Sequence, residues 1–301
     1  IPKRDWSSDV CSSDLTDYSV FCFLLKLYYG FYNIIKKQID LFQIKLYINF
    51  EETTYFSALF TNILKEDNIK SVTIQHGYTA VIDATLPLLS DYRFVWGNKT
   101  KSMYIDFGEN KRNIICIGEE LFSINNNTNT ERKDIYIICG FQKDYIYLAE
   151  WIIDILKSVL ANQKNSKIVI SFHPYQKNIQ TIRKIIDINY YNTISRYVYR
   201  ISDDDYKNAL IMIMDNSTVG FSAAIKGVNV IIIKNKENNL YDYINHNYFY
   251  KIININELPE IIEKIKNDTT NDIENKRKDF LYQYIFSEKS IKYIIEKILH
   301  E

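Results

Sequence analysis

The stretch "ALIMIMDNSTVGFSAAIKGVNVIII" (residues 209–233) decides the fold of this chain. Its two ends are apolar runs, and the segment between them, 218–226, has the length of a short helix. Apolar runs bounded by turn residues are typical of strands buried on both faces, and helices between such strands indicate a parallel sheet. Asn216 or Ser217 can cap the start of the helix, and Gly227 stands where a helix-ending glycine is expected. The stretch therefore predicts a strand–helix–strand unit.

The same alternation runs along the chain from residue 45. Further apolar runs predict strands at 45–50, 70–75, 92–97, 113–118, 135–141 and 167–172. Apolar residues at helical spacing predict helices between them, the strongest at 53–66 and 147–163. The Asn-rich stretch 123–134 has no apolar period and indicates a linker. We therefore expect an α/β protein with two Rossmann-like domains, 16–122 and 135–301, whose parallel sheets face a cleft.

The first fifteen residues differ in composition from everything that follows. "IPKRDWSSDVCSSDL" has no apolar period, and "DVCSSDL" resembles the translation of a sequencing-library adapter. We expect residues 1–15 to be an assembly artefact joined to a gene fragment, and the alternative is a disordered native tail. The first domain also has few strand signals before the linker, so we expect it to be incomplete.

The amino-acid composition narrows the classes of function that the protein can have. The chain has 37 basic and 37 acidic side chains, and this balance does not indicate a nucleic-acid-binding protein. The widely spaced cysteines indicate buried thiols in a reducing compartment, so we expect a cytoplasmic protein. The most apolar stretch, 18–35, is interrupted by polar residues and is expected to be a core helix. Its aromatic residues and the flanking lysines leave peripheral association with the inner membrane open.

Histidines follow two of the predicted strands, and ligands of open α/β sheets bind beyond the carboxyl ends of strands. His76 follows the strand at 70–75, where an imidazole can act as a general base or hold a phosphate, and Gly77 permits a sharp turn. His173 follows the strand at 167–172, and Pro174 restricts the backbone after it. That imidazole can donate hydrogen bonds to a phosphate. The alternative for both histidines is a structural role within a loop.

The helix at 218–226 offers a third candidate site. Its first turn presents free backbone N–H groups and the hydroxyls of Ser217 and Thr218, a combination that binds phosphate. Gly220 lets a neighbouring backbone or ligand come close. The alternative is an ordinary capped helix of an α/β unit.

The order of these motifs along the chain resembles that of a known group of enzymes. Gln75-His76-Gly77, then His173-Pro174, then the block from Asp215 to Ile233 resemble bacterial surface-polysaccharide glycosyltransferases of the GT-B type. Among these, the sequence is most similar to the polysialyltransferase-like, capsule-synthesis and CDP-glycerol glycerophosphotransferase groups. The resemblance covers roughly residues 70–235. It implies a GT-B-like architecture that binds a nucleotide-activated donor.

The resemblance also implies roles for donor-side residues. His173 would contact the donor phosphate, and Ser217 and Thr218 would bind phosphate or the sugar of the nucleotide. Lys143, in the loop after the strand at 135–141, is a further candidate phosphate ligand, although a solvated lysine is the alternative. Many such enzymes carry a ribose-binding glutamate in the following helix, where this chain has Ser222 and Ala223. This departure leaves the identity of the nucleotide open.

On the acceptor side, the resemblance implies that His76, Glu51 or Glu52 removes the proton from the acceptor hydroxyl. The two glutamates follow the strand at 45–50 and can equally complement a helix dipole. The acidic cluster at 201–208 is expected to cap a helix, and we expect no metal site.

We therefore expect a cofactor-independent glycosyltransferase that moves a sugar from a nucleotide-sugar donor to a glycan acceptor of the cell surface. Three alternatives stay open. They are a CDP-glycerol-type glycerophosphotransferase, a non-hydrolysing sugar-nucleotide epimerase, and an inactive fragment or binding module of the same fold.

Overall fold

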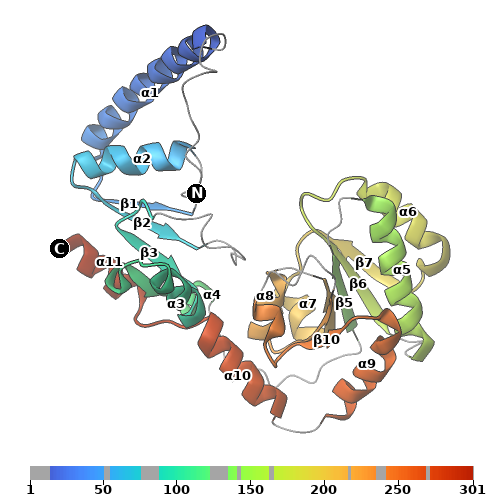
Figure 1. The fold of residues 1–301 in the computed structure, drawn as a ribbon. Coiled ribbons are helices and arrows are strands. Elements are labelled where there is room, and N and C mark those ends of the chain that lie inside the picture. Colours follow the sequence, from blue (N-terminus) through green and yellow to red (C-terminus); the bar gives the residue numbers. More distant parts are fainter. Residues whose placement is uncertain are drawn as a thin grey trace, which may run out of the picture.

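The computed structural model describes residues 14–50, 55–75, 88–122, 135–140, 144–162, 166–215, 218–234, 242–268 and 272–300. Within these residues the chain forms two parallel sheets (Figure 1). The first has the order β1-β2-β3-β4, with β1 (Leu46–Asn49), β2 (Lys70–Ile74), β3 (Tyr92–Val95) and β4 (Ile114–Cys116). The expected α/β class with two parallel sheets is thus confirmed.

The second sheet has six strands in the order β10-β9-β8-β5-β6-β7. They are β5 (Ile135–Gly140), β6 (Lys167–Phe172), β7 (Ile194–Val198), β8 (Ala209–Met214), β9 (Asn229–Ile233) and β10 (Tyr250–Ile252). The chain leaves β5 toward one edge and returns to β8 on its other side, which is the doubly wound order of a Rossmann fold. This reversal places the carboxyl ends of β6 and β8 on either side of β5.

Helices cover both faces of the first sheet. Helix α2 (Tyr55–Glu66) packs between α1 (Asp14–Phe42) and β1, where Tyr47 stacks on Phe60. Helix α3 (Asn98–Asp106) packs against Val95 of β3. The opposite face, which includes Val72 and Phe94, is covered by α11 (Ile291–His300). A short helix, α4 (Gly118–Phe122), follows β4.

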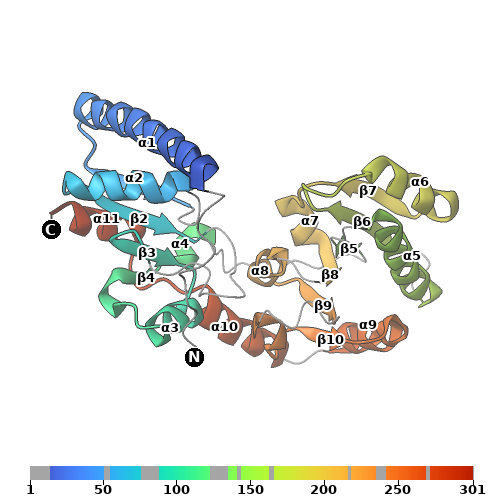
Figure 2. The same cartoon turned by 45° about the horizontal axis from the view of Figure 1, so that its top comes forward.

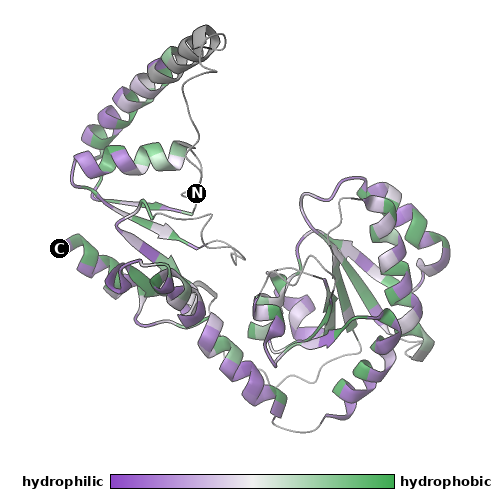
Figure 3. Cartoon of the chain, in the orientation of Figure 1, coloured by the Kyte–Doolittle hydropathy of each residue, from purple (hydrophilic) through white to green (hydrophobic). Residues whose placement is uncertain are grey.

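The second sheet is covered in the same way, because its strands are buried on both sides. Ile138 and Ile213 face α5 (Tyr145–Asn162), α6 (Ile179–Tyr190) and α9 (Leu258–Asn267). Cys139 and Met212 face α7 (Asp203–Asn208), α8 (Val219–Ile225) and α10 (Asp272–Tyr284). Figure 3 shows the strands of this sheet coloured mostly as hydrophobic, as double-sided burial requires.

The last two helices carry the chain back toward the first sheet (Figure 2). Helix α10 contacts both α8 of the second sheet and α3 of the first. Helix α11 then buries Ile294 and Ile298 against Val72 and Phe94. The expected second domain, 135–301, therefore needs a correction, since its last helix packs on the first sheet. Its apolar face completes the core there.

Local signals read from the sequence are borne out at two helix ends. Gly227 has a positive φ of 70° directly after Lys226, the C-cap residue of α8, as a helix-ending glycine should. The acidic cluster forms a capping box at the start of α7, in which Ser202 and Asp205 exchange hydrogen bonds. None of the described helices is both long and apolar enough to cross a membrane.

Candidate functional site

A hollow of about 560 Å³ opens at the carboxyl ends of β6, β7 and β8. Its walls come from three separate segments of the second domain: the turn after β6, the β7–α7 connection, and α8. They contribute Ser171, His173, Pro174, Tyr199, Arg200, Ile201, Asp203, Tyr206, Thr218, Val219, Ser222, Ile225 and Lys226. This is the edge of the sheet at which α/β proteins bind ligands. We call it the donor pocket.

His173 enters the donor pocket from a tight turn. The backbone N–H of Gln176 donates to the carbonyl of His173 at 2.8 Å, and Pro174 occupies the second position of that four-residue turn. The backbone N–H of Tyr175 donates to Nδ1 of His173 at 3.2 Å. The neutral ring therefore carries its proton on Nε2, the nitrogen that can donate to an anion.

Helix α8 supplies the opposite wall. Thr218 stands at its start, is exposed, and accepts a hydrogen bond on its carbonyl from the N–H of Phe221. Gly220 is buried, and a Cβ there would lie 2.9 Å from Cε of Met214, so this glycine lets α8 pack closely on β8. Ser222 faces the pocket, whereas Ala223 is fully buried in the core. Of the two positions that stand in place of the expected ribose-binding glutamate, only Ser222 therefore lies at the pocket wall.

The pocket wall carries more positive than negative charge. Arg200 and Lys226 line it together with the carboxylate of Asp203, and Lys226 forms an ion pair with Asp203 at 3.4 Å. Burial raises the pKa of the Tyr206 hydroxyl well above its usual range, so this group stays protonated and neutral. Two cations, a histidine and several hydroxyls suit a phosphate-bearing ligand.

Sequence reasoning had singled out His173 and Thr218, and the fold brings them to one pocket. It had missed Arg200 and Lys226. Arg200 follows β7, a strand that the sequence pattern did not predict. Lys226 could have been found, because it lies four residues after Ser222 and therefore on the same face of a helix.

Several predicted site residues lie outside the described residues. They are Glu51, Glu52, His76, Gly77, Lys143 and Ser217. The residue before His76 is described: Gln75 is buried and accepts a hydrogen bond at 2.8 Å on its side-chain oxygen from the N–H of Trp96. The indole N–H of Trp96 also donates to the carbonyl of Gln75 at 2.8 Å. The glutamine of this motif therefore has a structural role.

Trp96 links the two domains. Its ring meets Phe221 of α8 edge-on, with 5.3 Å between ring centroids. One residue of the first domain thus touches both the end of β2 and the helix that forms the pocket wall.

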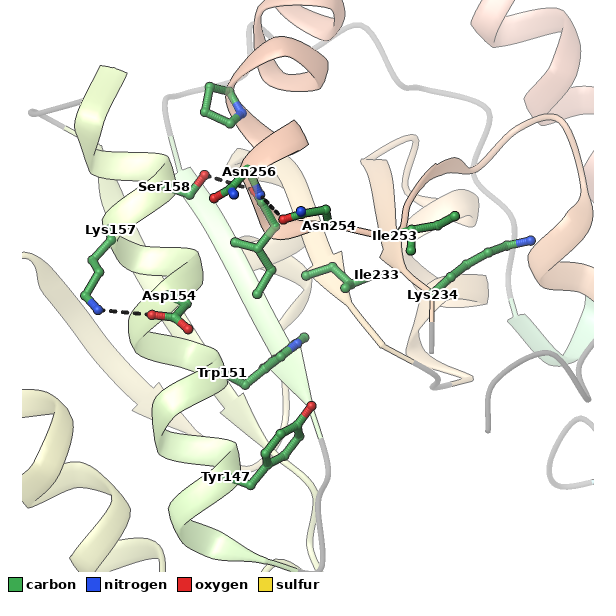
Figure 4. Close-up of a pocket in the computed structure, with 12 residues that line it drawn as sticks. Tyr147, Trp151, Asp154, Lys157, Ser158, Ile233, Lys234, Ile253, Asn254 and Asn256 are labelled. Atoms are coloured by element: carbon green, nitrogen blue, oxygen red, sulfur yellow. Dashed lines mark hydrogen bonds and ion pairs between the residues drawn. The ribbon is translucent and has the colours of Figure 1, made fainter. Parts of the chain in front are cut away.

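A larger hollow, of about 800 Å³, lies on the other face of the second sheet between α5 and the start of α9 (Figure 4). Several of its polar groups are engaged with one another. Lys157 pairs with Asp154 at 3.0 Å, and Ser158 donates to the carbonyl of Ile255 at 3.2 Å. None of the candidate residues lies in it, so we place the functional site in the donor pocket. Among the described residues, no group of three or more histidine, cysteine, aspartate or glutamate side chains is arranged to hold a metal ion.

Comparisons with known proteins define the fold. No protein-family model and no curated protein sequence matches the chain. Solved structures do match. A UDP-GlcNAc 2-epimerase from Methanocaldococcus jannaschii has a TM-score of 0.61 at 15% identity, over 90% of this chain and 81% of that one. A glycosyltransferase from Rickettsia africae has a TM-score of 0.57 at 12% identity, over 100% and 83%.

A third structure is similar to the same extent. The UDP-GlcNAc 2-epimerase from Neisseria meningitidis, solved with UDP-GlcNAc bound, has a TM-score of 0.55 at 12% identity, over 92% of this chain and 82% of that one. The chain has a GT-B-like fold. Identities this low show the fold alone, and the chemistry must be argued from the donor pocket.

Proposed function

We propose that the chain is a nucleotide-sugar-dependent glycosyltransferase that adds a sugar to a cell-surface polysaccharide. The observation that carries the proposal is the convergence of His173, Thr218, Arg200 and Lys226 on one pocket at the sheet's ligand-binding edge. The pocket is large enough for a nucleotide, and its charge suits the phosphates. A neighbour of the same fold was solved with a nucleotide sugar bound, which supports this ligand class.

The described residues suggest a division of roles. Nε2 of His173 donates a hydrogen bond to a phosphate oxygen as the bond to the sugar breaks and negative charge develops on the leaving group. Arg200 and Lys226 supply positive charge, and the hydroxyl of Thr218 adds a hydrogen bond. Ser222, exposed to the pocket, meets the ribose at the place where related enzymes use a glutamate.

The acceptor side belongs to the first domain in this proposal. His76, Glu51 or Glu52 removes the acceptor proton as the hydroxyl attacks the sugar. Ser217 and Lys143 add further contacts to the phosphates. No metal is required, because the cations of the pocket neutralise the leaving group.

The test is nucleotide binding by the full chain, measured by isothermal titration against UDP, CDP, GDP and CMP. We expect one of them to bind and His173→Ala to weaken it by at least 10-fold, as loss of a charge-assisted hydrogen bond predicts. His246→Ala is the matched control, since His246 also accepts a backbone N–H on Nδ1 but does not line the pocket. Failure of all four nucleotides to bind, or equal affinity of His173→Ala and wild type, would overturn the proposal.

A second candidate follows from the neighbours that are epimerases. Incubation with UDP-GlcNAc and no acceptor separates the two functions. Accumulation of the C2 epimer would favour an epimerase, whereas a transferase needs an acceptor before the donor is consumed.

A further inference from the structure

Positive charge gathers at the amino ends of the first-domain strands. Two hollows open there, of about 680 and 580 Å³, and Ile298 of α11 lines both. Three lysines line the first hollow, and an arginine with two lysines lines the second. These cations are Lys45, Lys65, Lys70, Arg112, Lys289 and Lys297. We call this surface the amino-end face; in Figure 1 the amino ends of these strands and the end of α11 lie at the left, near the C-terminal mark.

The acidic side chains around these cations are already engaged. Asp91 accepts hydrogen bonds from the N–H and the hydroxyl of Ser71, each at 2.8 Å. Glu288 pairs with Lys101. Among the described residues, no carboxylate forms an ion pair with Lys45, Lys65 or Lys70. Six cations and the carboxylates of Asp91 and Glu288 line the two hollows, and Glu288 is paired with Lys101, so the face carries an excess of positive charge within a chain of zero formal net charge.

Large apolar side chains flank the same lysines. Leu41 and Phe42 end α1, four and three residues before Lys45, and are 66% and 68% exposed. Leu299 of α11 lines the first hollow and is 47% exposed. Lysines beside protruding leucine and phenylalanine side chains are typical of surfaces that lie in the interface of a bilayer.

We propose that the amino-end face binds the surface of an anionic lipid membrane. The lysines contact lipid phosphates, while Leu41, Phe42 and Leu299 enter the acyl boundary. A bilayer satisfies both features at once, whereas a nucleic acid would leave the apolar side chains exposed. All strands of the first sheet are parallel, so this face lies opposite the carboxyl ends. Membrane binding would therefore leave the carboxyl ends, where the acceptor-side residues follow their strands, turned away from the bilayer.

The proposal is independent of the transfer reaction, because binding is measured without donor or acceptor. The experiment is flotation of the full chain with vesicles of phosphatidylcholine alone or of phosphatidylcholine and phosphatidylglycerol in equal parts. We expect binding only to the second kind. The triple variant Lys45→Glu, Lys65→Glu, Lys70→Glu should bind about 100-fold more weakly, from about 1 kcal/mol for each lysine.

The matched control replaces three exposed lysines on helices of the second domain by glutamate: Lys157, Lys184 and Lys264. It changes the net charge equally and should leave binding unchanged. Leu41→Ser with Phe42→Ser keeps every lysine and should weaken binding most clearly at high salt, where electrostatic attraction is screened. Circular dichroism and urea midpoints confirm that each variant is folded.

Three results would overturn the proposal. The first is equal binding to neutral and anionic vesicles, and the second is equal loss in the triple variant and its control. The third is absence of binding to either kind of vesicle, in which case lysine-dependent binding of a DNA fragment would identify a soluble polyanion as the partner.

Discussion

Replacing Arg277 by methionine tests whether α10 holds the pocket helix α8 in place. Arg277 is 5% exposed, and its Nη1 donates to the carbonyls of Ala224 and Ile225 at 3.2 and 3.3 Å. These are the last two carbonyls of α8, and that of Ala224 also accepts a hydrogen bond at 3.0 Å from the N–H of Gly227, beyond the end of the helix. The same guanidinium donates through Nε and Nη2 to both oxygens of Glu274, each at 2.7 Å.

The expected loss of stability follows from the groups that lose their partner when Arg277 is replaced. Methionine keeps most of the apolar stem, so the loss comes from Glu274 without its cation and from the two helix-end carbonyls, which both lose Arg277 as a donor while that of Ala224 keeps the N–H of Gly227. Breaking a buried pair costs about 3–5 kcal/mol. The Glu274 side chain is 37% exposed, and water partly replaces the lost partner. We therefore expect a loss of about 3 kcal/mol in the free energy of unfolding.

The assay is urea unfolding, followed in parallel by tryptophan fluorescence and far-UV circular dichroism, because coincident curves are needed before a single free energy is quoted. Glu274→Gln and the double variant complete a mutant cycle, and the double variant should lose at least 1 kcal/mol less than the sum of the single losses. A loss below about 1 kcal/mol for Arg277→Met, or strict additivity, would refute the reasoning. Nucleotide affinity should fall as well, since α8 forms one wall of the donor pocket.

Other predictions concern glycines and pH. A Cβ on Gly97 would clash with the backbone of Tyr284, so Gly97→Ala should lower the free energy of unfolding by at least about 2 kcal/mol. A Cβ on Gly220 would press on the flexible end of the Met214 side chain, so Gly220→Ala should lower it by less than about 1 kcal/mol. Urea unfolding midpoints compare the two variants. Burial lowers the pKa of His246, against the opposing effect of Asp279. Its contribution to stability is complete above its unfolded pKa and is lost as pH falls through the folded pKa. His246→Gln should therefore flatten the stability profile between about pH 7.5 and 5.5, and an unchanged profile would contradict this.

Glu274 adds a test at lower pH. The hydrogen bond from Arg277 lowers its pKa, so its stabilisation is present above the ordinary carboxyl pKa and is lost as pH falls through the lower folded value. Wild type should therefore lose more stability on acidification than Glu274→Gln. Equal acid sensitivity of the two proteins in urea titrations would show that the pair does not behave as described.

The sequence predicts the buried strands well because their signal is local. The run 209–214 is apolar throughout and is buried throughout apart from Leu210, so composition alone identifies β8. His173 was found for the same reason, since it follows such a run directly. The capping box of α7 is likewise a local signal, because Ser202 and Asp205 lie only three residues apart.

Other elements depend on partners that are distant in the chain. Strand β7 lies at the edge of its sheet, and two of its five residues are exposed, so its apolar pattern is weak. Helix α10 is mostly polar and is held by Arg277, Phe280 and Tyr284 through contacts with α8. The Trp96 link between the domains joins residues that no local pattern connects. Arg200 was missed because the strand before it was missed.

The return of α11 to the first sheet has a consequence for synthesis. The ribosome delivers β1 to β4 before the second sheet, yet Ile294 and Ile298, which cover Val72 and Phe94, are made only after that sheet. The first sheet therefore keeps one apolar face exposed to solvent and chaperones until α11 has been made, whereas the second sheet can fold before that. A nascent chain released before α11 would keep that face uncovered, so termination between α10 and α11 should yield aggregates rather than a shortened native protein.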